Sequence, residues 1–252
     1  MCLVLFGWRA HPRYALVLAA NRDEFHERPS AAAEFRTDPV EWLGGRDLQA
    51  GGTWLGLTRT GRFAAVTNYR EPTAPEPPLE RSRGELVVGF LEGQSSPLDH
   101  ARAVLAQGAS WRGFNLLLGT PHSLVWVSNR HDRASEVEAG CHGLSNHLLD
   151  TDWPKVRSGR ARLQAILESG SLTVESLLEL LADRGQAPGG MPIGADDGEV
   201  REHLMNHHFI LSPVYGTRSS TVLLMEYGGR MEFVERRFGP DGRVLGTSRF
   251  AL

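Results

Sequence analysis

The sequence predicts an α+β protein of mostly antiparallel sheets with helices packed on the outside. Apolar segments of strand length follow one another through short polar turns, and helical periodicity is confined to two patches between the groups of strands. No regular crossover helix joins successive strands, and no Gly-rich phosphate-binding motif follows the first one. A doubly wound parallel sheet is therefore not expected.

Two hairpins are predicted in the first third of the chain. Residues 3–8 and 14–20 are apolar runs joined by a short polar link. Residues 54–58 and 62–67 form the second pair, joined by a turn that contains Gly61. Each pair is expected to be antiparallel, because its link is too short for a crossover connection.

Four helical segments are predicted from apolar residues at helical spacing. The first patch covers 84–91 and 97–107, and the second covers 156–168 and 174–183. Thr173 precedes the last segment and is expected to cap it, since a threonine hydroxyl can accept a free backbone N–H of the first turn.

The remaining strands and loops follow from apolar runs and turn residues. Further strands are expected at 114–119, 123–128, 207–211, 220–227 and 230–238. Residues 72–78 hold four prolines and are expected to form a loop. Residues 185–198, rich in Gly, Pro and Asp, are expected to form a second one.

Composition and charge exclude several classes of function. The chain has 252 residues, 41% of them hydrophobic, which is enough to bury the core of one domain spanning 1–252. A net charge of −3 without a basic block argues against nucleic acid as a partner. No apolar run reaches the roughly 20 residues that span a bilayer, and the apolar start lacks the basic region of a signal peptide. We expect a cytoplasmic protein without a transmembrane segment.

The two cysteines and the histidines give no sign of a disulfide framework or a metal site. Cys141 has no CxxC partner, and we expect it to be a reduced thiol, unconnected to Cys2 and dispensable for function. His203, His207 and His208 lack the spacing of a zinc site. A single histidine would still suffice as an axial ligand of haem.

Cys2 is the strongest candidate for chemistry. Removal of Met1 would leave Cys2 as the first residue, with a thiol and a free amine on the same residue. An α-amine has a pKa of about 8, so it can act as the base for its own thiol near neutral pH. The alternative interpretation is a small apolar residue at the start of a strand.

The run Asn-Arg-Asp-Glu at 21–24 directly follows the second predicted strand. In an antiparallel hairpin the exit of the second strand lies opposite the entry of the first, so this run should lie beside Cys2. Arg22 and Asp23 could then hold the amine and lower the pKa of the thiol. An ordinary turn is the alternative, because Asn and Asp both favour turns.

Three further polar residues lie at predicted strand ends. Asn68 and Asn146 could each donate an amide N–H to a developing oxyanion, or could simply form Asx turns. Arg218 precedes an apolar strand and could clamp a carboxylate or support the nucleophile, the alternative being a surface charge on a turn.

Two further segments are interpreted as structural. Gly51 and Gly52 predict a tight turn that enters the next strand, with a close backbone approach as the functional variant. Residues 150–155 predict a helix start with Asp152 as the N-cap. Lys155 is the only lysine of the chain, which we attribute to compositional bias rather than to function.

Several of these motifs occur together, in the same order, in one known family. The chain resembles the NRDE family, also called the transport-and-Golgi-organisation protein 2 family, over almost its whole length. The matching pieces are Met-Cys at 1–2, Asn-Arg-Asp-Glu at 21–24, Gly-Gly-Thr-Trp at 51–54, Thr-Asn-Tyr-Arg at 67–70, Gly-Leu-Ser-Asn at 143–146, Trp-Pro-Lys at 153–155 and Tyr-Gly-Thr-Arg-Ser-Ser-Thr at 215–221.

The resemblance extends, more distantly, to the N-terminal nucleophile hydrolases. It implies a four-layer αββα sandwich of two mostly antiparallel sheets covered by helices, similar to the bile-salt hydrolase and penicillin V acylase group. By the same resemblance, the catalytic residues would be Cys2, Arg22, Asp23, Asn68, Asn146 and Arg218. In that group the Arg and Asp are separated by two residues, whereas here they are adjacent, and neighbours on a strand point to opposite faces.

Two functions are carried forward. The first is a cysteine hydrolase of a linear amide or thioester, which uses Cys2 and needs no cofactor. The second, which the NRDE resemblance implies, is a non-catalytic carrier that binds haem or an acyl-CoA or lipid in the same cleft. Both functions predict a small-molecule ligand.

Overall fold

The described residues of the computed structural model form two compact units, each built on one antiparallel sheet. The structure describes residues 2–37, 40–70, 81–184 and 206–252. The first unit comprises Met1–Arg28, Ala139–Leu144 and Asp150–Ala251, and the second comprises Pro29–Glu138 and Ser145–Leu149 with Leu252. The prediction of an α+β protein with two antiparallel sheets is confirmed.

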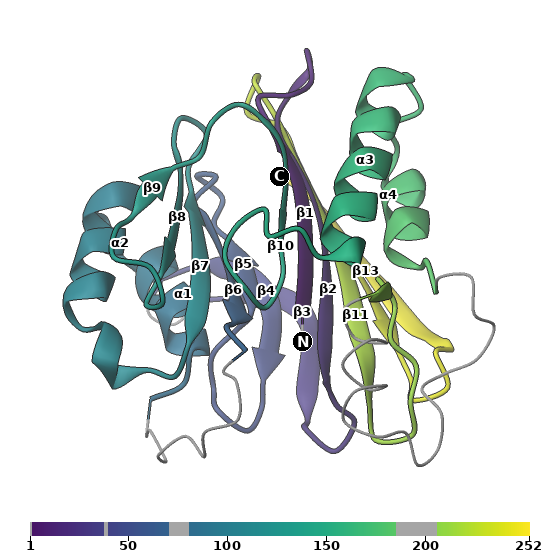
Figure 1. The fold of residues 1–252 in the computed structure, drawn as a ribbon, viewed down its shortest axis with the longest axis horizontal. Coiled ribbons are helices and arrows are strands. Elements are labelled where there is room, and N and C mark those ends of the chain that lie inside the picture. The colour runs from purple at the N-terminus through teal and green to yellow at the C-terminus, as the bar shows by residue number, and fades with distance from the viewer. Residues whose placement is uncertain (1, 38–39, 71–80, 185–205) are drawn as a thin grey trace. The chain divides into compact units, whose positions relative to one another are not determined.

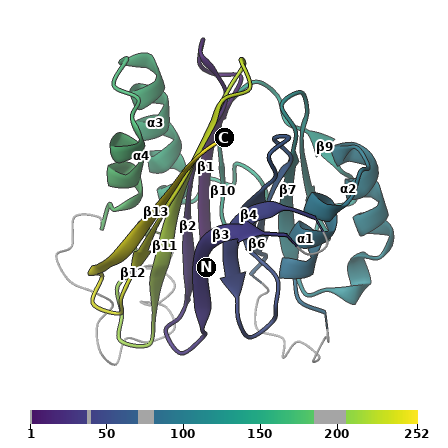
Figure 2. The same ribbon diagram turned by 180° about the vertical axis from the view of Figure 1, so that it is seen from behind.

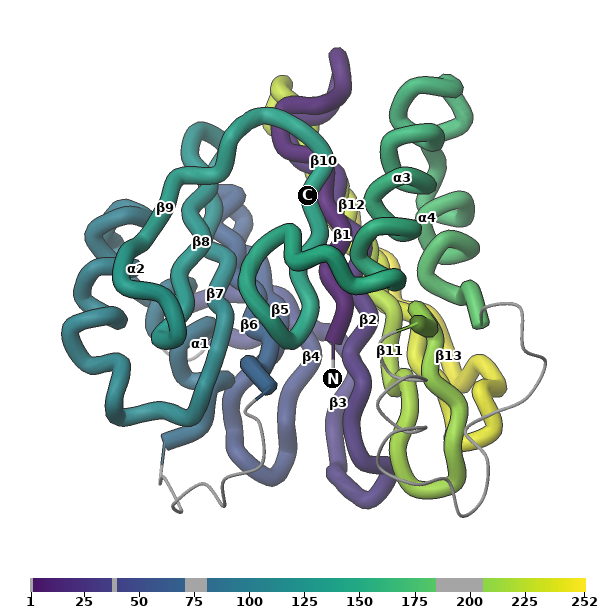
Figure 3. Tube along the Cα trace, viewed as in Figure 1, coloured from purple at the N-terminus to yellow at the C-terminus, as the bar shows by residue number. Residues whose placement is uncertain are grey.

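The first unit contains a six-stranded sheet in the order β10-β1-β2-β11-β12-β13, and every neighbouring pair is antiparallel (Figures 1 and 2). The Cα trace places β1 between β10 and β2 (Figure 3). The strands are β1 (Cys2–Trp8), β2 (Tyr14–Phe25), β10 (Gly140–Leu144), β11 (Tyr215–Glu226), β12 (Met231–Phe238) and β13 (Val244–Ala251).

Two helices, α3 (Pro154–Glu168) and α4 (Val174–Leu181), cover one face of this sheet. Strand residues alternate between faces, so Leu3 and Leu5 of β1 pack into the core under the helices. Cys2 and Val4 belong to the opposite face. Thr173 caps α4 as predicted, in a reciprocal capping box with Ser176.

The second unit contains a seven-stranded sheet in the order β3-β4-β5-β6-β7-β8-β9. Its strands are β3 (Ser30–Arg36), β4 (Trp42–Asp47), β5 (Leu55–Leu57), β6 (Phe63–Asn68), β7 (Phe114–Gly119), β8 (Leu124–Ser128) and β9 (Ser135–Glu136). The helices α1 (Gly84–Glu92) and α2 (Pro97–Ala106), followed by the short 3₁₀ helix η1 (Gly108–Ser110), lie on one face. Phe90 and Phe114 are fully buried in the core between helices and sheet.

The predicted hairpins and helices are present, but two element predictions are wrong. Residues 207–211 do not form a strand. Phe209 N–H donates to Asp183 O and Ile210 N–H donates to Thr217 Oγ1, so isolated hydrogen bonds take the place of a regular ladder with a neighbouring strand. Asp152 does not cap α3, whose N-cap is Trp153; the Asp152 carboxylate instead pairs with Arg157 at 2.8 Å.

Several predicted features need no correction but differ in extent. β2 continues through the Asn-Arg-Asp-Glu run to Phe25, because β1 and β11 pair with it on both sides. β3, β4, β9 and β13 were not anticipated. The loops predicted at 72–78 and 185–198 lie outside the described residues, as does His203.

The glycine pair at 51–52 forms the predicted tight turn with a close backbone approach. Gly51 has a φ of +81°, a left-handed conformation that glycine adopts without strain. A Cβ on Gly52 would lie 2.6 Å from the carbonyl carbon of Gly84, where α1 begins. The motif therefore has a packing role between the β4–β5 connection and α1.

Among the described residues, no helix is both long and apolar enough to cross a bilayer.

Candidate active site at the end of strand β1

Cys2 and Arg22 face each other across the β1–β2 pair. Cys2 is the first residue of β1, and its Cα partner in the antiparallel register is Arg22. Directly opposite residues of a sheet project their side chains to the same face. The prediction that the Asn-Arg-Asp-Glu run lies beside Cys2 is therefore confirmed.

Arg22 brings a buried positive charge to this face. Its side chain is only 5% exposed, and Nη2 lies 3.9 Å from Oε2 of Glu24, two residues further along the same strand. Glu24 in turn lies 3.8 Å from Nε of Arg28. The Arg22 guanidinium thus lies on the same face of the sheet as Cys2, followed by the Glu24 carboxylate and then the Arg28 guanidinium.

Asp23 projects to the other face of β2, toward the helices. The carboxylate is buried, and Thr217 Oγ1 donates a hydrogen bond to its Oδ1 at 2.7 Å. Tyr215 Oη donates to the Asp23 backbone carbonyl at 2.9 Å. Burial raises the pKa of the Asp23 carboxyl, while the charge of the N-terminal amine, the charge of Lys155, the bond from Thr217 and the charge of Arg22 act in the opposite direction.

The Cys2 thiol is partly buried, and that burial raises its pKa. The charge of the N-terminal amine lowers the thiol pKa and the negative charge of Asp23 raises it further, whereas a hydrogen bond from the Asp23 backbone and the charge of Arg22 lower it. The balance keeps the thiol protonated at neutral pH, so it would need a base to act as a nucleophile.

Arg218 occupies a β-bulge between Thr217 and Ser219 in β11. Its Nη1 donates to the backbone carbonyls of Phe25, His26 and Arg28 at 2.9, 3.0 and 3.2 Å. These three hydrogen bonds stabilise the backbone of residues 25–28, where β2 ends. Burial and the nearby charge of Arg22 lower the pKa of Arg218. Its role as a carboxylate clamp stays a prediction.

Asn68 and Asn146 meet in the second unit. Asn146 is buried, and its Nδ2 donates to the backbone carbonyl of Asn68 at 2.7 Å, while Asn146 O accepts from Arg70 N–H at 2.9 Å. Asn68 is the last residue of β6. These bonds hold the two segments together, and the predicted role of either residue as an oxyanion donor stays a prediction.

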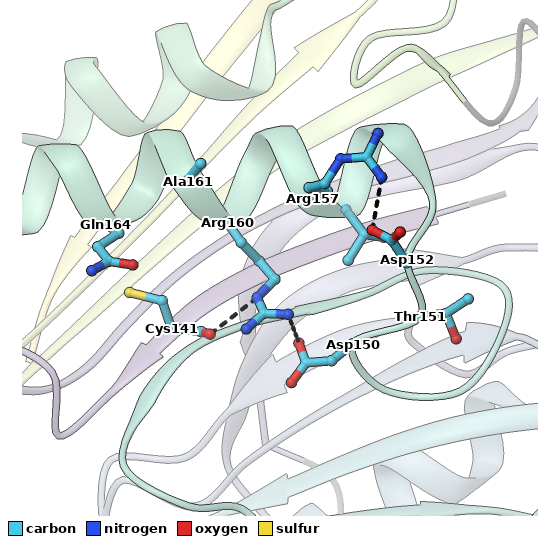
Figure 4. A pocket seen from close by; sticks show the side chains of 9 residues that line it. Cys141, Asp150, Thr151, Asp152, Arg157, Arg160, Ala161 and Gln164 are labelled. Carbon is cyan, nitrogen blue, oxygen red and sulfur yellow. Dashed lines mark hydrogen bonds and ion pairs between the residues drawn. The ribbon is translucent and has the colours of Figure 1, made fainter.

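Cys141 lines a separate cavity of about 210 Å³ between β10 and α3 (Figure 4). Arg160 crosses this cavity, donating from Nε to Cys141 O at 3.2 Å and pairing with Asp150 at 3.3 Å. Cys2 and Cys141 are not joined by a disulfide, as predicted. None of the predicted site residues lines this cavity. The dispensability of Cys141 stays a prediction.

Lys155 is the charged residue that our interpretation of the sequence missed. It is the second residue of α3 and its side chain is fully buried. Its charge acts on Asp23, from the helix-covered side of β2. The only usable signal was its uniqueness in a chain that otherwise uses arginine.

His208 completes a buried polar layer beside Lys155. Its Nε2 lies 3.0 Å from Lys155 O and 3.2 Å from Ser158 Oγ, and its Nδ1 lies 3.1 Å from Leu180 O. The His208 carbonyl accepts a bond from Asn21 Nδ2 at 2.8 Å. Burial lowers the pKa of this imidazole below its ordinary 6.5.

The buried His208 should make the protein less stable in mild acid. Below pH 6.5 the unfolded chain takes up a proton that the folded imidazole resists, so folding stability falls by up to about 1.4 kcal/mol per pH unit. His208→Gln should flatten the pH dependence of the free energy of unfolding between pH 7.5 and 5.5, measured by urea titration. The exposed His122→Gln is the control, and an equal slope in both variants would contradict the assignment.

The fold and site define an α+β protein with a cysteine paired with a buried arginine at the start of an interior strand. The family model described as "Transport and Golgi organisation 2" matches residues 1–240, and the chain belongs to this family. The family predicted from the motifs is thus confirmed.

Relatives in animals match almost end to end. "Transport and Golgi organization protein 2 homolog" of Bos taurus is 36% identical over 94% of this chain and 92% of its own. The Homo sapiens protein of the same name is 35% identical with the same coverage. "Transport and Golgi organization protein 2" of Drosophila melanogaster is 27% identical over 93% and 91%.

Among solved structures, the chain is similar to the Caenorhabditis elegans N-acylethanolamine-hydrolyzing acid amidase (NAAA) ortholog. The identity is 12%, the TM-score is 0.49, and the match covers 88% of this chain and 92% of that one. This likeness assigns neither an activity nor a ligand to the present chain.

Proposed function

We propose that this protein is a cysteine hydrolase of the N-terminal nucleophile type, acting on a linear amide or a thioester. The observation that supports it is the Cys2 thiol at the end of β1, with Arg22 opposite it and a hydrogen bond from the Asp23 backbone. The proposal requires that Met1 be removed, so that Cys2 carries a free α-amine.

The first half of the reaction acylates the thiol. The α-amine of Cys2 accepts the Sγ proton while Sγ attacks the substrate carbonyl carbon, and the S–C bond forms with a negative charge on the carbonyl oxygen. Collapse of this intermediate breaks the C–N bond of an amide or the C–S bond of a thioester. The leaving amine or thiolate takes the proton from the α-ammonium.

The second half regenerates the enzyme. Water attacks the acyl group on Cys2 and gives a proton to the α-amine, and the intermediate then expels Sγ. The carboxylic acid leaves, and the proton returns to the sulfur. The raised pKa of the thiol makes the α-amine essential in this scheme, because little thiolate exists without a base.

A single-turnover acylation experiment tests the proposal. Purified protein is mixed with a panel of N-acyl amides and acyl-CoA thioesters, and intact mass is measured before and after. We expect an acyl adduct on Cys2 in the processed protein, absent from Cys2→Ala. It should also be absent when a glutamate inserted after Met1 prevents Met1 removal, because the α-amine is then a peptide nitrogen.

Cys141→Ala is the matched control, since it removes the other cysteine thiol and should retain the adduct. No adduct across the panel, together with haem or acyl-CoA binding that Cys2→Ala leaves unchanged, would overturn the hydrolase. That result would favour the carrier instead.

A further inference from the structure

Ser219 of β11 carries a buried hydroxyl group that forms no hydrogen bond within the part of the chain that the structure describes. The residue is only 3% exposed, and its Oγ has no partner there. A hydroxyl that is removed from water without a replacement bond destabilises the folded state. Because buried polar groups are almost always paired, this hydroxyl calls for an acceptor that the folded chain does not supply.

The strand register places Ser219 in one row with Cys2. Arg22 on β2 is the Cα partner of Cys2 on one side and of Ser219 on the other. Directly opposite residues project to the same face, so all three side chains lie on the face of the sheet away from α3 and α4. Neighbouring strands lie about 4.8 Å apart, which puts the Cα atoms of Cys2 and Ser219 about 10 Å apart, with Arg22 between them.

The surroundings of Ser219 explain why its hydroxyl stays unpaired. The next residue, Ser220, points to the helix-covered face, where its Oγ donates to Asn21 Oδ1 at 2.6 Å. Arg237 is the partner of Ser219 on β12, but its side chain lies over Gly246, with Nη2 only 3.4 Å from the place that a Cβ would take. A serine one position along the strand is therefore paired, whereas Ser219 is not.

The row presents hydrogen-bond donors to a bound molecule. A guanidinium can only donate, so the Arg22 side chain cannot accept the proton of the Ser219 hydroxyl. A substrate carbonyl carbon reacts from about 3 Å away from Cys2 Sγ, and an acceptor oxygen lies about 3 Å from Ser219 Oγ. With the two residues about 10 Å apart, this oxygen lies at least about 4 Å from the reacting carbon, or roughly three bonds or more along the substrate.

We infer that Ser219 is a substrate-binding residue of the Cys2 site: its hydroxyl donates a hydrogen bond to a substrate oxygen that lies roughly three bonds or more from the scissile carbonyl carbon. The inference deepens the proposed function and rests on it, because it assigns to the amide or thioester a second polar oxygen. That oxygen belongs either to the acyl group or to the leaving group, and the experiment distinguishes the two.

Two pairs of thioester probes test this on protein from which Met1 has been removed. S-ethyl 4-oxooctanethioate differs from S-ethyl octanethioate by one oxygen in the acyl group. The octanoyl thioester of N-acetylcysteamine differs from S-pentyl octanethioate by an amide in the leaving group. The rate of Cys2 acylation is followed by intact mass. Wild type should react about tenfold faster with the oxygen-bearing member of one pair, and Ser219→Ala should remove that advantage.

Ser220→Ala is the matched control, because it removes the neighbouring hydroxyl, which is paired with Asn21 on the other face. It should keep the preference for the oxygen-bearing probe. In urea titration Ser219→Ala should unfold at the same midpoint as wild type or a higher one, whereas Ser220→Ala should unfold at a lower midpoint because Asn21 loses a donor. A midpoint for Ser219→Ala as low as that of Ser220→Ala would reveal a structural hydrogen bond and overturn the inference.

The remaining outcomes separate this inference from the proposed function. Acylation without a preference in either pair would overturn the role of Ser219 and leave the hydrolase standing, as would an equal loss of rate in Ser219→Ala with both members of a pair. If no probe acylates Cys2, the hydrolase is overturned and binding decides the inference. Protection of Cys2 against iodoacetamide is then measured in a Cys141→Ser background. Stronger protection by the oxygen-bearing member, lost in Ser219→Ala, would support the inference, and equal protection within both pairs would overturn it.

Discussion

Lys155→Met should lower the free energy of unfolding by about 1–3 kcal/mol, because the fully buried side chain loses its polar end and the buried polar groups around it lose a partner. The Asp23 carboxyl, which accepts from Thr217 Oγ1, would also lose one of the positive charges that lower its pKa. The free energy of unfolding from urea titration at pH 7 measures the effect.

Two comparisons show whether the effect comes from the burial of Lys155. Asp23→Asn/Lys155→Met should recover part of the loss, because the neutral amide no longer depends on nearby positive charge. Arg157→Met removes an exposed charge two residues further along α3, and its pair with Asp152 should contribute at most about 1 kcal/mol. A Lys155→Met variant no less stable than Arg157→Met would contradict a stabilising role for the buried lysine.

Gly52→Ala should lower the free energy of unfolding by about 1–3 kcal/mol through overpacking. The added Cβ would meet the carbonyl carbon of Gly84 at 2.6 Å and its Cα and O at 2.9 Å. These are backbone atoms at the start of α1, so no side-chain rotation can relieve the contact.

The matched control is Gly89→Ala in α1, the helix that begins at Gly84. A Cβ there meets no atom within 4 Å, and alanine has the higher helix propensity, so this variant should gain about 0.5–1 kcal/mol. The two glycine-to-alanine changes should therefore have opposite signs in the same urea titration. A Gly52→Ala variant with an unchanged free energy of unfolding would show that the β4–β5 connection can move away from α1.

The β1–β2 pairing could be predicted from the sequence because it is local. Two apolar runs joined by a short link leave one register that buries both, and this register alone places Arg22 opposite Cys2. The adjacency of Arg22 and Asp23 also predicted opposite faces, as found. For β1 and β2, the pattern of apolar residues and the geometry of a strand both indicate the observed pairing.

Elements whose character depends on distant partners could not be predicted. β3 contains three consecutive alanines without a clear apolar–polar alternation, and no residue of β13 is fully buried. Phe209 and Ile210 make residues 209–211 look like part of a strand, and both are buried although they join no sheet. Apolar character alone does not distinguish these cases.

The site residues likewise divide into those that local sequence could place and those that depend on distant segments. Lys155 looks like an ordinary residue of a helical first turn, and only the packing of α3 on the sheet makes its side chain fully buried. Arg218 sits in a bulge that shifts the register by one residue, and no local pattern marks that shift. The structure therefore adds chiefly contacts between segments that the chain separates.

The sheet of the first unit has a consequence for the order of events during synthesis. β2 pairs with β1 as soon as residues 2–25 have emerged, but its other neighbour, β11, begins at Tyr215. Until then one edge of a long, apolar hairpin keeps its backbone N–H and C=O groups unpaired, which is the type of edge that recruits other chains. Such late, distant pairing slows folding and prolongs this exposure, so we expect a nascent chain of this protein to aggregate more readily before β11 has been made than after it, which refolding of C-terminally truncated chains would measure.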